Sequence, residues 1–122
     1  MKLALFSDIH ANLQALDACL AHSRQSGAGQ WAFLGDLVGY GGDPGPVLDQ
    51  IQQLAERGAW VVQGNHDAMA VSPPAQSERQ GEATAQWTHA QLSSAHHHFL
   101  SNLPLTAQVG SLFLVHASAD AP

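Results

Sequence analysis

Three short apolar runs, separated by stretches of helical periodicity, constrain the fold of this chain more than any other feature. The runs are residues 2–7, 31–35 and 59–64, and each has the length of a strand buried on both faces. Leucines at helical spacing predict a helix over residues 12–25, and an aspartate-proline pair starts a second helix that ends at Gly58. Because the connections are short, the alternation predicts an α/β domain with a mostly parallel sheet and right-handed crossovers.

The pattern changes after the third apolar run. Residues 71–82 hold adjacent prolines and few apolar side chains, which predicts a surface loop. One helical stretch then runs to Leu92, and another covers residues 93–100. Two strand-like runs, 105–109 and 112–115, flank a glycine-serine pair, which is a hairpin signal. We find no internal repeat, so residues 1–122 are expected to form a single domain.

The charge balance excludes several kinds of partner. Ten acidic residues against four basic ones give a formal net charge of −6, which repels nucleic-acid backbones and anionic membranes. No apolar run approaches the roughly 18 residues that cross a bilayer. Lys2 leads directly into a strand-like run rather than a signal peptide, so we expect a cytoplasmic protein. The single cysteine, Cys19, falls in a helical pattern and is expected to be buried filler.

Potential metal ligands follow four of the predicted strands. They are Asp8 and His10 after the first strand, Asp36 after the second, Asn65, His66 and Asp67 after the third, and His116 after the last. Each of these residues alone is typical of a turn or a structural position. Because the carboxyl ends of parallel strands meet at one sheet edge, we expect their side chains to lie close together. Mixed carboxylate, imidazole and amide ligands suit Mn, Fe, Zn or Ni better than calcium.

These residues also stand in the order of a known motif set. The chain resembles the calcineurin-like metallophosphoesterases, whose motifs are D-x-H, G-D, G-N-H-[DE], a later H and a final G-H-x-H. Four of the five occur in order between residues 8 and 116. Three stretches, LGDLVGYGGDP, VVQGNHDAMA and LFLVHASADAP, are also similar to a small single-domain bacterial subgroup. The resemblance implies the first half of a four-layer αββα sandwich.

The same resemblance implies two divalent transition metal ions and a small phosphate-ester substrate. By this resemblance, Asp8 and His10 bind one ion, Asp36 bridges both ions, and Asn65 and His116 bind the second. Two ions clamp a phosphoryl group and lower the pKa of a bound water, so that hydroxide attacks phosphorus in line.

Three residues are candidate catalytic residues by this resemblance, namely Asp36, Asn65 and His66. His66 matches the family histidine that contacts phosphate and protonates the leaving oxygen. Asp67 has two readings that the residues leave open, since it either orients His66 or caps the next helix. The remaining histidines are expected to be structural or to lie on an exposed or partly packed face, and they are His22, His89 and residues 96–98.

The chain departs from the family pattern in two places. Members that act on phosphoproteins have Val-Asp-Arg-Gly where this chain has residues 38–41, Val-Gly-Tyr-Gly, so the choice between monoester and diester substrates stays open. The final G-H-x-H is missing before Pro122, which predicts an incomplete domain with one bare sheet face. A second copy of the chain is expected to cover that face.

Two function hypotheses follow. The first is a metal-dependent phosphoesterase, and the alternative is a catalytically inactive, truncated form that binds at most one metal ion and self-associates. A dinucleotide-binding domain is disfavoured because Gly39, Gly41 and Gly45 miss the G-x-G-x-x-G spacing by one residue and follow the second strand rather than the first.

Overall fold

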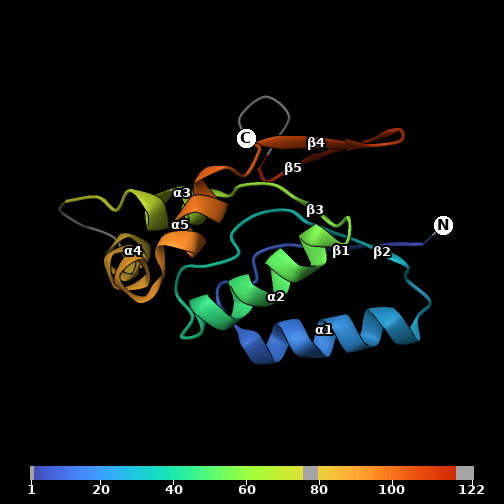
Figure 1. Cartoon of the computed structure of the whole chain (residues 1–122), viewed down its shortest axis with the longest axis horizontal. Helices are drawn as coiled ribbons and strands as arrows, with labels where there is room; N and C mark the ends of the chain where they lie inside the picture. Colours follow the sequence, from blue (N-terminus) through green and yellow to red (C-terminus); the bar gives the residue numbers. More distant parts are fainter. Residues whose placement is uncertain (1, 76–79, 118–122) are drawn as a thin grey trace.

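The computed structural model describes residues 2–75 and 80–117 (Figure 1). The elements are β1 (Leu3–Phe6), α1 (Leu13–Gln25), β2 (Gln30–Phe33), α2 (Pro44–Glu56), β3 (Trp60–Val61), α3 (Asn65–Val71), α4 (Gln80–Gln91), α5 (Ser94–Ser101), β4 (Thr106–Val109) and β5 (Leu112–Val115). The predicted α/β class with flanking helices is confirmed.

β1, β2 and β3 form a parallel sheet in chain order, with β2 in the centre. Both β2 and β3 end earlier than the apolar runs predicted. β2 stops at Phe33 because Gly35 and Asp36 adopt left-handed backbone conformations, with φ of 99° and 52°. β3 is shorter still, because the N–H of Gln63 donates to the carbonyl of Pro104 (2.8 Å) and leaves the sheet. These exits turn the chain sharply at one edge of the sheet.

The two faces of the sheet pack against different layers. Phe33 points into the larger hydrophobic cluster, with α1 and α2, and is fully buried there. Ala32, its neighbour, points the other way and packs against Val109 and Leu114 of the β4–β5 hairpin. Figure 1 accordingly shows α1 and α2 on one side of the sheet and the hairpin on the other.

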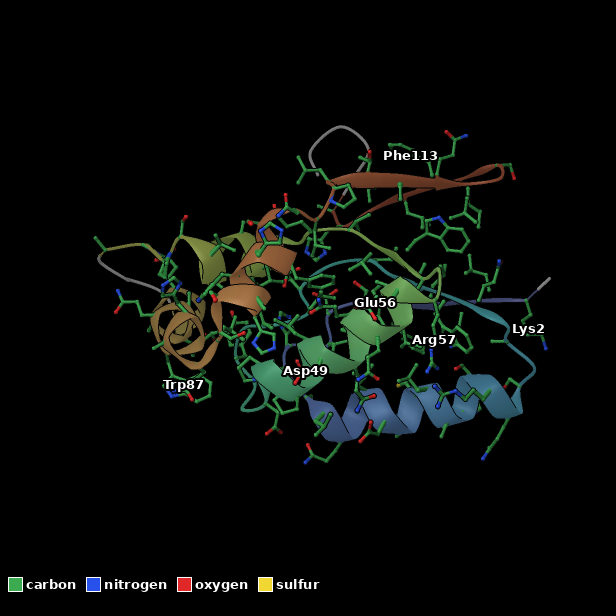
Figure 2. The ribbon with its side chains drawn as sticks, in the orientation of Figure 1. Lys2, Asp49, Glu56, Arg57, Trp87 and Phe113 are labelled. Carbon is green, nitrogen blue, oxygen red and sulfur yellow. The ribbon has the colours of Figure 1, made fainter. Side chains whose placement is uncertain are left out.

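The hairpin corrects the expectation that one sheet face lies bare, because it covers part of that face. β4 and β5 are antiparallel, and Val109 pairs with Leu112 across a two-residue turn, which confirms the hairpin signal. Some apolar surface stays exposed around it. Leu5 is 51% exposed on β1, and Leu112 and Phe113 are 47% and 55% exposed on β5. Phe113 lies on the outer side of the hairpin (Figure 2).

The helices α1 and α2 begin where the sequence predicted, but only one of them has a side-chain capping hydrogen bond. Asn12 caps α1, since its side-chain Oδ1 accepts from the N–H of Ala15 (3.0 Å). Asp43 occupies the same position before α2, yet its carboxylate makes no capping hydrogen bond. The prediction that Cys19 is buried is wrong: it is exposed on α1, because the buried stripe of that helix passes through Leu16 and Leu20.

Two further points concern the helices after β3. α4 begins at Gln80, so the last part of the predicted surface loop over residues 71–82 is helical, while residues 76–79 lie outside the described part. Within the described ranges, no helix has the length and apolar character needed to span a membrane.

Candidate metal centre

Three predicted ligands meet where the strands end. Asp8 follows β1, Asp36 follows β2 and His116 follows β5, and one potential ligand atom from each lies within 4.8 Å of the others. Within this group, His116 Nε2 lies 3.3 Å from Asp36 Oδ2. Two carboxylates and an imidazole at this separation are a donor set that could hold a divalent transition metal ion.

The two remaining predicted ligands border this group. His10 Nε2 lies 3.4 Å from Asp8 Oδ1 and 3.8 Å from Asp36 Oδ2. Asn65 Oδ1 lies 3.1 Å from His116 Nε2. The structure thus brings all five residues together around Asp36, although their assignment as ligands stays a prediction.

Both imidazoles present Nε2 to the cluster for the same reason. His10 Nδ1 lies 3.1 Å from the carbonyl of Val38, and His116 Nδ1 lies 2.8 Å from the carbonyl of Leu34. A carbonyl can only accept, so each Nδ1 carries a proton and donates to the carbonyl, which turns each Nε2 toward the cluster. This arrangement is typical of histidines that bind metals.

Asp36 is the best shielded carboxylate of the cluster, with only 4% of the residue exposed. Its Oδ1 accepts a hydrogen bond from the N–H of His66 (2.9 Å), which leaves Oδ2 facing the two imidazoles. Gly64 makes this position possible, because a Cβ there would lie 2.3 Å from both the backbone N and Oδ1 of Asp36. The glycine beside Asn65 is therefore required by close packing against the carboxylate.

Asp8 is the exposed carboxylate of the cluster, and its side chain is 54% accessible. The hydroxyl of Ser7 donates to its Oδ2 (2.5 Å). This hydrogen bond is the largest cause that lowers the pKa of Asp8; burial, second in size, opposes it, and smaller effects of His116 and His10 lower the pKa further. The carboxylate is thereby kept in the ionised form that a metal ligand needs.

His66 stands beside the cluster rather than in it. Its ring centroid lies 5.2 Å from that of His10 and 4.9 Å from that of Tyr40. Gly39 makes room for the ring, since a Cβ at that position would lie 3.0 Å from it. The Nδ1 of His66 is buried and has no hydrogen-bond partner among the described residues, so the ring is not committed to a structural contact.

Asp67 has a role that neither sequence reading anticipated. It is the third residue of α3 and fully buried, and its carboxylate accepts from the N–H groups of Leu37 (2.9 Å), Val38 (3.2 Å) and Gly64 (2.9 Å). Burial raises the pKa of Asp67 to about 7, although these three donors favour the ionised form. Asp67 ties the loop after β2 to the start of α3.

The N-cap reading of Asp67 is therefore wrong in its position, and the reading that Asp67 orients His66 stays a prediction. The residue at the N-cap of α3 is Gly64, and no described hydrogen bond joins Asp67 to the ring of His66. The signal that could have found its role is the spacing, because an acidic third helical residue commonly accepts from the N-cap N–H.

His89, His96 and His97 make structural contacts away from the cluster, as expected. The rings of His89 and His97 lie 4.3 Å apart, and His89 Nδ1 lies 2.7 Å from the carbonyl of Ala70. His96 Nε2 lies 2.7 Å from Asp49 Oδ1 and so connects α5 to α2.

Comparison with known proteins assigns the family. The family model described as the calcineurin-like phosphoesterase superfamily domain matches residues 1–121. This chain belongs to that superfamily. The resemblance drawn from the strand-end motifs is thus confirmed, as is the fold class that it implied.

Individual superfamily relatives share the fold over most of the chain. The crystal structure of a metallophosphoesterase from Sphaerobacter thermophilus is 32% identical with a TM-score of 0.77, over 93% of this chain and 45% of that one. An uncharacterised protein of Methanocaldococcus jannaschii is 33% identical over 105 residues, which are 84% of this chain and 42% of the relative.

A third comparison shows the fold alone. It is the crystal structure of a candidate diadenosine tetraphosphatase, with 24% identity and a TM-score of 0.73, over 95% of this chain and 50% of that one. The chain spans half or less of the length of each of these three proteins.

Proposed function

We propose that this domain hydrolyses phosphate esters with divalent metal ions held at the carboxyl ends of its strands. The observation that carries the proposal is the convergence of Asp8, Asp36 and His116 within 4.8 Å, in a chain of the calcineurin-like phosphoesterase superfamily. His10 and Asn65 lie against the same three residues and extend the donor set on either side.

The geometry supports a division of the donors into two groups. Asp8 pairs with His10 at 3.4 Å, and Asn65 pairs with His116 at 3.1 Å. Asp36 Oδ2 faces both imidazoles, so this carboxylate suits the bridging position between two ions. Such ions, when bound, stabilise charge at phosphorus and supply hydroxide at neutral pH. Mn, Fe, Zn and Ni all suit these donors.

His66 is the proposed general acid for the leaving oxygen. Its backbone N–H is held by Asp36, which fixes the ring next to the donor cluster without using a ring nitrogen. A proton delivered from such a position contributes roughly 10²- to 10⁴-fold to a rate.

The positions of the lysine and arginine side chains support a small ester as substrate. Lys2 contacts the carbonyl of Ser26, and Arg24 lies over the ring of Trp31, both away from the cluster. Among the described residues no lysine or arginine lines the groove that adjoins the centre. The bound ions would therefore carry most of the charge neutralisation of the phosphate, which leaves little for recognising a polyanion.

The direct test is hydrolysis of bis(p-nitrophenyl) phosphate in the presence of Mn, Fe, Zn or Ni ions. We expect turnover that requires an added ion and is lost in Asp36→Asn, while Glu56→Gln, an exposed carboxylate on α2, keeps it. Absence of turnover with every ion would contradict the proposal.

A second candidate function is an inactive form that binds at most one ion and self-associates. The exposed apolar side chains of Leu5, Leu112 and Phe113 favour this association. Sedimentation velocity across a concentration series separates the possibilities. A monomer at all concentrations would contradict the second candidate.

A further inference from the structure

A groove of about 530 Å³ adjoins the candidate metal centre. It shares Asp8 and His10 with the centre and continues between the start of α1 and the loop after β2, past Asn12, Tyr40 and Asp43. A phosphate ester bound at the shared residues would place one of its organic groups in this groove.

The ring of Tyr40 forms one wall of the groove and contacts the reactive end of it. Its centroid lies 5.1 Å from the ring of His10 and 4.9 Å from the ring of His66. Even so, 53% of the residue is exposed. An aromatic ring that is anchored on one side and free on the other can pack against a planar group.

The backbone holds Tyr40 at this place at some cost. Its φ of 64° is in the left-handed region, which costs a bulky residue roughly 1–2 kcal/mol. The N–H of Tyr40 donates to Thr84 Oγ1 (3.4 Å), and Gly41 packs so closely that a Cβ would lie 1.9 Å from the carbonyl oxygen of His10. Strain retained by the surrounding structure next to a candidate active centre suggests a functional reason for the side chain.

Asp43 is a second residue of the groove that could affect binding, through its negative charge. It stands at the N-cap of α2, makes no capping hydrogen bond, and is one of the residues that line the groove. It adds a negative charge away from the metal ligands, and none of the described lining residues is a lysine or arginine that would offset it. A group with an additional negative charge would be repelled there.

We infer that this groove binds an organic group of the ester, and that Tyr40 selects a planar aromatic group without negative charge. The inference rests on the proposed function for the placement of the phosphate. It names a substrate class, an aryl-bearing phosphate ester, and a specificity-determining residue outside the donor cluster.

The test measures binding rather than turnover. Phenylphosphonate and methylphosphonate are titrated calorimetrically into the chain with Mn²⁺ present, since neither is hydrolysed and they differ only in the organic group. We expect phenylphosphonate to bind about tenfold more tightly, as aromatic packing of this size predicts. Equal affinities for the two phosphonates would overturn the inference.

Two variants separate the ring from the backbone. Tyr40→Asn removes the ring and favours the left-handed backbone, so it should fold and lose the preference, whereas Tyr40→Phe should keep it. A preference that survives Tyr40→Asn would overturn the role of this residue. The charge preference is tested with 4-carboxyphenylphosphonate, which should bind more weakly than phenylphosphonate. Asp43→Asn should reduce this difference in affinity between the two phosphonates. An unchanged difference would overturn the role of Asp43.

The outcomes distinguish this inference from the proposed function. Hydrolysis of bis(p-nitrophenyl) phosphate with equal phosphonate affinities would contradict the groove assignment alone. A Tyr40-dependent preference without any hydrolysis would contradict the enzymatic proposal alone. Binding of neither phosphonate would contradict both.

Discussion

The Nε2 atom of His116 lies 3.3 Å from Oδ2 of Asp36, although the two residues come from different layers of the molecule. Asp36 follows the central strand of the parallel sheet, and His116 follows the second strand of the hairpin that packs on that sheet. The Nδ1 of His116 contacts the carbonyl of Leu34 at 2.8 Å, which fixes the hairpin against the exit of β2. Formation of the candidate metal centre is therefore coupled to docking of the hairpin.

This coupling predicts the effect of a mutation in the hairpin core. Leu114→Ala should destabilise the fold by about 2–4 kcal/mol, because it leaves a cavity against Ala32, and should weaken metal binding through His116. Urea unfolding and a Mn²⁺ titration measure the two effects. The control is Phe113→Ala, 55% exposed on the opposite hairpin face, which should change stability by less than about 0.5 kcal/mol. Equal effects of the two variants would argue against the docking account.

The close approach of Gly64 to Asp36 predicts a second result. Gly64→Ala should cost about 1–3 kcal/mol of stability and lower metal affinity, since the added Cβ would lie 2.3 Å from Asp36 Oδ1. Gly42→Ala is the matched control, because a Cβ there meets nothing within 4 Å. Unchanged metal affinity in Gly64→Ala would show that Asp36 is not positioned by this packing.

Asp67 provides a third prediction, on stability. Asp67→Asn replaces one carboxylate oxygen by an NH₂ group, which donates and cannot accept. The variant side chain therefore cannot accept from all three N–H groups, those of Leu37, Val38 and Gly64. We expect a loss of about 1–3 kcal/mol in the free energy of unfolding. Glu56→Gln is the control, since it makes the same chemical change at an exposed position. Equal stability of both variants would contradict the assigned role.

His66 provides a prediction about rate. His66→Gln should lower kcat for bis(p-nitrophenyl) phosphate by about 10²- to 10⁴-fold while the metal content stays unchanged. The reason is that the His66 ring lies next to the donor cluster without belonging to it. Loss of metal in this variant would instead place His66 among the ligands.

Local sequence signals sufficed for the α1 helix and for the strand-end residues. Leucine spacing predicted a helix over residues 12–25, and α1 covers Leu13–Gln25 with Asn12 as its cap. The approach of Asp8 to Asp36 followed from parallel pairing alone, because parallel strands end at a common edge.

Features that depend on packing between distant segments could not be read from the sequence. The hairpin residue Leu114 covers a sheet face that was expected to be bare, and nothing near it in sequence specifies that surface. The exposure of Cys19 depends on which stripe of α1 meets the core. The left-handed conformations of Asp8, Asp36 and Tyr40 are equally hidden, since none of them is glycine.

The most direct test of the account is a calorimetric titration of Mn²⁺ into the wild-type chain, Asp36→Asn and Glu56→Gln. Asp36 Oδ2 faces the imidazoles of both His10 and His116, so Asp36→Asn should lose at least about 100-fold in metal affinity, as expected for a direct ligand. Glu56→Gln should bind Mn²⁺ like wild type. Equal affinity of wild type and Asp36→Asn would contradict the central claim that these strand ends form a metal centre.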